Sequence, residues 1–272
     1  MLRSLWSAAT GMNAQQTNVD TIANNLANVN SAGYKAQKAQ FKSLLYQTLQ
    51  SRTTTANGDP KPTYSQIGLG VRTSSINNIY TQGSLLESPS DTAFAIEGDG
   101  FFAVQGEDGN RYYTRNGDFT WAMNTNGGMI LTNQDGLPVL SSTGRTITLN
   151  RNYIASRISI TQDGEVCYPD ADNNPQPIGI KIGVYQFSNP GGLERYGDTL
   201  LVQTEASGNV INEDTNPNVK KSRVIQGYLE GSNVSVADEM VNLIVAQRAY
   251  EMNSKAITTS DSMMETANNL KR

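Results

Sequence analysis

Histidine is absent from this chain of 272 residues, and cysteine occurs once, as Cys167. Without histidine the chain lacks the commonest general base and metal ligand of enzymes, which excludes zinc hydrolases and Ser/His or Cys/His catalysis. A single cysteine excludes an intramolecular disulfide. Its neighbours Gly164 to Tyr168 alternate as in a strand. This pattern indicates a small buried or edge side chain and not a reactive thiol.

Long apolar runs and strong net charge are also missing. No apolar run approaches the roughly 18 residues of a membrane span. Arg3 and the apolar patch Leu5 to Ala9 are soon followed by polar residues, which is too short for a cleavable signal peptide. The net charge of -4 argues against a nucleic acid partner. These rules alone predict a cytoplasmic protein, unless a dedicated export machine reads an uncleaved signal.

Catalytic and cofactor motifs are not found either. The hydrophobic content of 37% and the mean hydropathy of -0.46 are low for a compact enzyme but too high for a disordered chain. Phosphate-binding loops, nucleophile elbows and calcium loops do not occur. The carboxylates of Asp99 and Asp118 sit in glycine turns, where Asp favours the backbone geometry. We therefore predict no catalytic residue, metal or cofactor.

Both ends of the chain have a heptad pattern typical of long helices that pack on other helices. The first helix is expected from about Leu2 to Asn28, with Gly33 as its C-terminal cap. It carries eight Asn or Gln between Asn13 and Asn30, but only two charged residues. Amides form hydrogen bonds to neighbouring chains at a lower desolvation cost than ions, although an ordinary core helix remains an alternative. Its two columns contain Leu2, Ala9, Gln16 and Ala23, and Leu5, Met12, Val19 and Leu26.

The second helix is expected from near Ser235, with Ser235 as the N-cap and two acidic residues in the first turn. Its apolar column contains Val236, Leu243, Tyr250, Ile257 and Met264, and its second column is mixed, with Met240, Gln247, Ser254 and Asp261. A broad stripe of this kind predicts packing on more than one neighbour.

The middle of the chain, about 76–225, has the spacing of short strands. Glycine turns recur every eight to ten residues between Gly109 and Gly144, and Ile178 to Val184 alternates with period two. This pattern predicts an all-β sandwich or barrel-like domain. The segment Tyr46 to Arg72, which includes Pro60 and Pro62, predicts an extended loop or long hairpin.

Three sequence blocks resemble the bacterial flagellar rod and hook proteins. The N-terminal block contains Asn24, Asn25, Leu26, Ala27 and Asn28, followed by Gly33, Tyr34 and Lys35. The central block contains Gly98, Asp99, Gly100, Phe101 and Phe102, followed by Tyr113 to Phe119. The C-terminal block runs from Gln226 to Val234 and leads into Gln247 to Glu251. The length, the opening residues and the 46–72 segment are most similar to the distal-rod members of this family. Residues 121–124, Trp-Ala-Met-Asn, depart from the usual acidic residue followed by glycine.

The resemblance implies a mixed α and β fold, in which long N- and C-terminal helices form a coiled-coil domain with an inserted all-β domain. The implied division is 1–31 plus 232–272 for the helical assembly domain, 32–75 for a connecting domain, and 76–231 for the outer β-rich domain. The assembly residues would be Leu2, Leu5, Met12, Val19 and Leu26 with Val236, Met240, Leu243, Tyr250, Ile257 and Met264. Tyr46, Pro60, Pro62 and Arg72 would mark a rod-stiffening segment.

The resemblance also implies a structural subunit that forms a rigid hollow helical drive shaft. This shaft would carry torque to the hook and enclose the export channel. The implied partners are copies of the chain, proximal-rod subunits, the hook protein, the peptidoglycan and outer-membrane bushing rings, and the rod-cap protein. The flagellar type III export gate would secrete the subunit with an uncleaved signal, and Phe41 and Leu45 resemble the element that the gate recognises. The implied location is the flagellar basal body, from the periplasm to the outer membrane.

Several alternatives remain open from the sequence. Within the family, a proximal-rod or hook-type axial subunit is the competitor. Outside it, an extracellular adhesin or a tail-tube-like protein would also be β-rich with assembling termini. An enzyme without histidine is a further alternative, which an activity screen would test.

Overall fold

The computed structural model describes residues 2–50, 65–124, 127–170, 172–197 and 199–270. The chain separates into two compact units, and we describe each by itself. The first contains residues 1–27, 37–78 and 235–272, and the second contains 28–36 and 79–234. The finer division into helical, connecting and outer domains stays a prediction.

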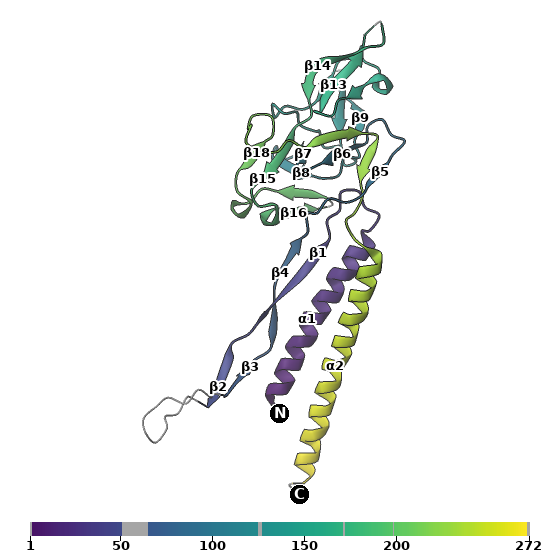
Figure 1. The fold of residues 1–272 in the computed structure, drawn as a ribbon. Coiled ribbons are helices and arrows are strands. Elements are labelled where there is room, and N and C mark those ends of the chain that lie inside the picture. Colours follow the sequence, from purple (N-terminus) through teal and green to yellow (C-terminus); the bar gives the residue numbers. More distant parts are fainter. Residues whose placement is uncertain (1, 51–64, 125–126, 171, 198, 271–272) are drawn as a thin grey trace, which may run out of the picture. The chain divides into compact units, whose positions relative to one another are not determined.

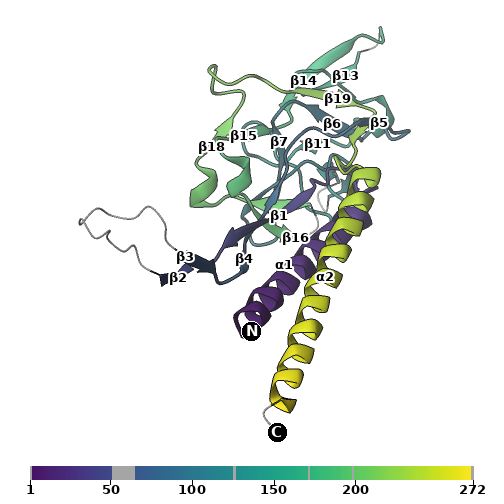
Figure 2. The ribbon, with the colours of Figure 1, turned by 60° about the horizontal axis from the view of Figure 1, so that its bottom comes forward.

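Two long helices form most of the first unit. Helix α1 spans Leu2–Ala27 and helix α2 spans Val236–Asn269. Figures 1 and 2 show the helices side by side and antiparallel, with the N-terminal end of α1 and the C-terminal end of α2 at the same end of the pair. The Ser235 hydroxyl accepts a hydrogen bond from the Asp238 amide, so the predicted N-cap is confirmed. Acidic residues follow in the first turn, where the helix dipole favours negative charge.

A two-stranded ribbon completes this unit (Figure 1). Strand β1 (Gln37–Ser43) pairs antiparallel with β4 (Val71–Asn78), and β2 (Tyr46–Gln50) pairs antiparallel with β3 (Ser65–Gly68). Within the predicted segment 46–72, strands β2 and β3 pair as the two arms of a hairpin, and Pro60 and Pro62 lie outside the described residues. Gly70 has φ +111°, and a Cβ there would lie 2.1 Å from the Thr10 hydroxyl of α1. Glycine is thus required where the ribbon approaches the helix.

The second unit is built from short strands, in agreement with the predicted β-rich middle. Its largest sheet is antiparallel and has six strands in the order β16-β17-β8-β7-β15-β18, and β9 to β11, β12 to β14, β6 with β19, and β5 with β20 form smaller sheets. The strands are β5 (Leu85–Glu87), β6 (Phe94–Glu97), β7 (Phe101–Gln105), β8 (Arg111–Thr114), β9 (Thr120–Met123), β10 (Met129–Thr132), β11 (Thr148–Leu149), β12 (Ser159–Ile160), β13 (Glu165–Pro169), β14 (Pro175–Lys181), β15 (Val184–Phe187), β16 (Glu194–Gly197), β17 (Leu200–Val202), β18 (Val210–Asn212), β19 (Arg223–Gln226) and β20 (Tyr228–Glu230). Short 3₁₀ helices occur at Ala155–Arg157, Pro190–Gly192 and Glu205–Ser207.

The central strands of the six-stranded sheet are covered on both faces. Phe102 and Val104 of β7 pack in one apolar cluster with Phe94, Phe119 and Leu131. The alternate residues, Phe101 and Ala103, pack in a second cluster with Tyr113, Tyr185 and Phe187. Because successive side chains of a strand point to opposite faces, a run of consecutive apolar residues marks a strand covered on both sides.

Several local predictions have direct outcomes. Helix α1 ends at Ala27, and Gly33 lies six residues beyond it, so the prediction that Gly33 caps this helix was wrong. Gly33 has φ +70°, and a Cβ there would lie 2.5 Å from the backbone nitrogen of Asn116. Its role is a close backbone approach. Cys167 is buried in β13, and burial raises the pKa of its thiol, as expected for an unreactive side chain. Among the described residues, no helix is both long and apolar enough to cross a membrane.

Candidate assembly sites

The contact between α1 and α2 follows one antiparallel register. The Ser4 and Ser260 hydroxyls lie 3.4 Å apart, and the side-chain nitrogen of Asn25 donates to Glu239 Oε1 at 3.5 Å. Between them, a Cβ on Gly11 would lie 2.9 Å from the Asn253 side-chain nitrogen. A step of seven residues along α1, from Ser4 to Gly11, matches a step of seven back along α2, from Ser260 to Asn253. The same register places Ala246, which is buried, opposite Asn18.

This seam includes three of the five residues of the apolar column predicted for α2. Leu243, Ile257 and Met264 are half-buried, as expected for seam positions. The second column is Glu239, Ala246, Asn253 and Ser260, one residue before the expected Met240, Gln247, Ser254 and Asp261. Met240 is accordingly 53% exposed, and Val236 and Tyr250 are exposed as well. On α1, Leu5, Met12, Val19 and Leu26 are half-buried.

Outside the seam, α2 presents a large apolar surface. Its outer face is the set of residues Met240, Val241, Ile244, Val245 and Met252, each more than half exposed. Arg248 is the only charged side chain between Met240 and Ala249. Trp6 on α1 is also exposed, at 70%. Large apolar side chains gathered on one helix face indicate an interaction surface.

Asn25 joins the three elements at the end of α1. Its side-chain nitrogen donates to the carbonyl of Gln37 at 2.8 Å, and its oxygen accepts from the amide of Gln37 at 2.8 Å. The side chain therefore pairs with the first residue of β1 and, through Glu239, with the first turn of α2. Burial raises the pKa of Glu239, and the hydrogen bond from Asn25 partly offsets this effect. Asn24 is exposed and donates to the Gln37 side chain at 3.0 Å.

A buried ionic cluster joins three distant segments of the second unit. Lys35 Nζ lies 2.6 Å from Glu230 Oε1, and Arg115 Nη1 lies 3.2 Å from Glu230 Oε2. The Lys35 ammonium also donates to the Thr81 carbonyl at 2.8 Å, and Arg115 donates to the Gly98 carbonyl at 2.7 Å. The exposures of Lys35, Arg115 and Glu230 are 4%, 3% and 1%.

Each charged residue of this cluster comes from a different signature block. Two cations share one carboxylate, so the cluster carries a net positive charge away from water. Burial lowers the pKa of Lys35, while the Glu230 charge opposes this effect. The Arg115 Nε is buried and has no hydrogen bond partner among the described residues. The blocks that carry the family resemblance therefore meet at a structural site, which the sequence did not indicate.

The other signature residues of the second unit have packing roles. Gly98, Asp99 and Gly100 form the turn between β6 and β7, and Asp99 is exposed. A Cβ on Gly100 would lie 2.3 Å from Val184, so only glycine fits. Phe101 and Phe102 fill opposite faces of the sheet. Tyr34 is buried, with the Arg195 guanidinium 5.1 Å from its ring centre. Asn28 is half-buried and Ala27 is exposed.

Asn233 connects two further segments of the second unit by hydrogen bonds, a role that the sequence analysis did not predict. Its side-chain oxygen accepts from the Ala36 amide at 2.7 Å, and its nitrogen donates to the Ile79 carbonyl at 2.8 Å. The sequence signal available was its place in the C-terminal block.

The ribbon leaves aliphatic side chains in solvent. Leu45, Leu49, Ile67 and Leu69 are 83%, 50%, 40% and 39% exposed. Phe41, at a bulge in β1, is 39% exposed. Both residues of the possible export-gate element are therefore accessible. Tyr46 is 62% exposed in β2, and Arg72 is exposed in β4.

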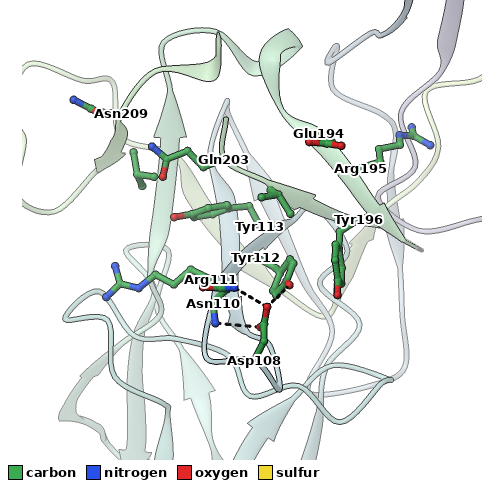
Figure 3. Close-up of a pocket in the computed structure, with 12 residues that line it drawn as sticks. Asp108, Asn110, Arg111, Tyr112, Tyr113, Glu194, Arg195, Tyr196, Gln203 and Asn209 are labelled. Carbon is green, nitrogen blue, oxygen red and sulfur yellow. Dashed lines mark hydrogen bonds between the residues drawn. The ribbon is translucent and has the colours of Figure 1, made fainter. Parts of the chain in front are cut away.

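A polar groove lies over β8 and β16 in the second unit (Figure 3). Its volume is about 840 Å³ and its lining includes Asp108, Arg111, Glu194 and Tyr196. Asp108 accepts hydrogen bonds from the Asn110 side chain at 2.6 Å and from the Tyr112 hydroxyl at 2.9 Å. These bonds hold the carboxylate within its own turn. In the described part of the chain, no group of three or more Cys, Asp or Glu residues is suited to a metal ion.

Three family models match the chain in order. They are the flagella basal body rod protein at 5–35, the flagellar hook protein FlgE/F/G D1 domain at 95–168, and the flagellar basal body rod FlgEFG protein C-terminal at 225–270. The flagellar basal-body rod protein FlgG of Borreliella burgdorferi is 43% identical over 274 residues and covers 100% of both chains. The chain belongs to the family of flagellar basal-body rod proteins. The FlgG protein of Buchnera aphidicola from Schizaphis graminum is likewise 43% identical, over 97% of this chain and 98% of its own.

This family membership confirms the resemblance found in the sequence blocks. Among solved structures, the flagellar hook protein FlgE2 of Helicobacter pylori matches at 14% identity with a TM-score of 0.23. The match covers 72% of this chain and 43% of that chain, and a score this low is no evidence about the fold.

Proposed function

We propose that this chain polymerises with copies of itself into the distal rod of the flagellar basal body. This proposal rests mainly on the 43% sequence identity to FlgG rod proteins, which extends over nearly the full length of both chains. FlgG is the structural subunit of the distal rod, and this chain is accordingly a structural rod subunit. We propose that it has no enzymatic activity.

The helices α1 and α2 form a coiled coil in this proposal. The antiparallel heptad register of Ser4 with Ser260 and of Gly11 with Asn253 supports it. The outer face of α2 then packs on a second copy, because an apolar helix face needs a partner that covers it. Self-association also fits the amide-rich surface of α1, which offers hydrogen bonds without ionic desolvation.

The ribbon stiffens the polymer in this proposal. A two-stranded ribbon alone has marginal stability. The exposed side chains of Leu45, Leu49 and Ile67 would be buried if a neighbouring subunit packed against the ribbon. Tyr46 and Arg72 bound this bracing segment. Repeated contacts of one kind between identical subunits generate a helical tube, and contacts in several domains resist shear under torque.

The finer partners and the location belong to the same proposal. The tube encloses the export channel, continues from proximal-rod subunits, carries the hook, and runs from the periplasm through the peptidoglycan and outer-membrane rings. The type III export gate secretes the uncleaved chain through an element containing Phe41 and Leu45, and a rod-cap protein assists assembly. The accessibility of both residues supports the gate element.

A proximal-rod or hook-type subunit is the second candidate, since the matching family models are shared by rod and hook proteins. Deleting the gene separates the candidates. If the chain is a distal-rod subunit, cells that lack the gene should build the proximal rod but no hook. Electron microscopy of the purified polymer should then show a straight hollow tube. Loss of the proximal rod, or a curved flexible polymer, would contradict the distal-rod proposal.

A further inference from the structure

The facing columns of the helix pair are unusually small and polar. On α1 they contain Ser4, Gly11, Asn18 and Asn25, and on α2 Glu239, Ala246, Asn253 and Ser260. Large apolar residues are abundant on α2, yet its outer face presents them to solvent. A seam that prefers polar residues gives up stability, and a single polar residue in such a seam is known to fix register.

Two contacts make the register specific. Gly11 leaves the space that Asn253 fills, because a Cβ at Gly11 would lie 2.9 Å from the Asn253 nitrogen and 3.2 Å from its carbonyl carbon. Asn25 is fully buried and holds Glu239 in the first turn of α2. Asn25 is itself fixed by the backbone of Gln37, so this end of the seam has no freedom to slide.

If α1 and α2 shifted by one heptad relative to each other, the contact of Gly11 with Asn253 and that of Asn25 with Glu239 would both be lost. In one direction Asn253 would face Asn18, and Glu239 would lie beyond the end of α1 at Ala27. In the other direction Asn253 would face Ser4, and Asn25 would lie before the start of α2 at Val236. In either case a side chain with a Cβ replaces Gly11 opposite Asn253, which overpacks that layer.

We propose that Gly11, Asn25, Glu239 and Asn253 are the register-determining residues of the terminal helix pair. They restrict α1 and α2 to one antiparallel alignment and keep the apolar outer face of α2 free for a second copy of the chain. The second clause rests on the proposed polymerisation, whereas the register itself does not.

A disulfide scan of the full chain tests the register. In a Cys167→Ala background, Ser4→Cys with Ser260→Cys places two thiols where the hydroxyls are 3.4 Å apart. Oxidation of dilute monomer should give an intrachain disulfide, read by non-reducing electrophoresis and mass spectrometry. The matched pair Ser4→Cys with Ala267→Cys, whose second position lies one heptad further along α2, is out of register and should cross-link at least about tenfold more slowly. Equal rates for the two pairs would overturn the proposal.

A swap tests the named residues. Gly11→Asn in the Ser4→Cys/Ser260→Cys chain should slow cross-linking several-fold, and Asn253→Gly added to it should restore the rate. Asn has a better helix propensity than Gly, so the loss cannot come from a weaker helix. The control Ala23→Asn adds the same side chain on an exposed part of α1 and should have no effect. Unchanged cross-linking in Gly11→Asn, or no rescue by the swap, would refute the assignment.

The outcomes distinguish a failure of the proposed helix register from a failure of the proposed rod function. Cross-linking is read in the monomer and needs no polymer. In-register cross-linking without tubes rejects the proposed function alone, and out-of-register cross-linking with normal tubes rejects the register alone.

Discussion

Lys35 and Glu230 form an ion pair at 2.6 Å although 195 positions separate them in the chain. Both side chains are almost completely buried, and Arg115 shares the same carboxylate. The pair holds a segment that follows α1 against a segment that precedes α2. A charge cluster of this kind is costly to desolvate, and removing one member leaves the others uncompensated.

Glu230→Gln should therefore destabilise the second unit by about 3–5 kcal/mol, because two buried cations lose their only carboxylate partner in the cluster. Denaturant unfolding followed by near-UV circular dichroism measures the change. The control Glu251→Gln breaks the exposed Arg248–Glu251 pair and should cost about 0.5 kcal/mol or less. Similar losses for both variants would show that the buried cluster contributes little.

The stability of the second unit should fall as the pH rises above about 10. Burial raises the pKa of Tyr113 from 10.0 to about 12. Between these values the unfolded chain loses the tyrosine proton while the folded chain keeps it, so the unfolded state binds fewer protons and is favoured. Tyr113→Phe should flatten the decline in the free energy of unfolding between pH 10 and 12. The control Tyr46→Phe changes a residue that is 62% exposed and should leave the profile unchanged. A Tyr113→Phe profile as steep as that of the parent would contradict this origin.

Asn25→Ala should loosen the junction of α1, β1 and α2 by about 1–3 kcal/mol, because the backbone amide and carbonyl of Gln37 lose their hydrogen bonds to the buried Asn25 side chain. Thermal unfolding of the helices at 222 nm measures it. Asn24→Ala removes an exposed hydrogen bond beside it and should have a much smaller effect. If the two variants melted alike, the junction would not depend on Asn25.

Ile244→Asp should block polymerisation without unfolding the monomer. Ile244 lies on the outer face of α2 and is 58% exposed, so its charge meets water until a second copy covers it. Sedimentation and electron microscopy measure assembly, and circular dichroism measures helix content. Thr258→Asp, on the same side of α2 two heptads later, replaces a polar exposed residue and should still polymerise. Normal tubes from Ile244→Asp would exclude this face as the interface.

Deleting residues 51–66 should give a chain that is exported and polymerises into a more compliant or curved tube. A bracing segment resists bending, because bending brings subunits together on one side and separates them on the other. Bending fluctuations in electron micrographs measure the stiffness, and transplanting the segment into a hook protein should straighten the hook. Tubes as straight and stiff as the parent would make the segment a passive loop.

The sequence by itself determined the element types and their order. Heptad spacing identified both terminal helices, glycine turns identified the short strands, and Ser235 identified the start of α2, because these signals depend on local periodicity and capping. The three signature blocks identified the family. In contrast, Gly33 was misread as a helix cap, since a glycine that permits a close approach has the same local signature as one that ends a helix.

Only the tertiary structure decided which residues meet. The sequence could not place Lys35, Arg115 and Glu230 together, because burial of charge depends on contacts between segments far apart in the chain. It also favoured Met240 over Glu239 for the helix seam, since apolar periodicity alone favours the larger side chain. The actual seam is set by the close fit of Gly11 to Asn253 and by the hydrogen bond of Asn25 to Glu239, and steric fit and hydrogen-bond geometry exist only once both helices are in place.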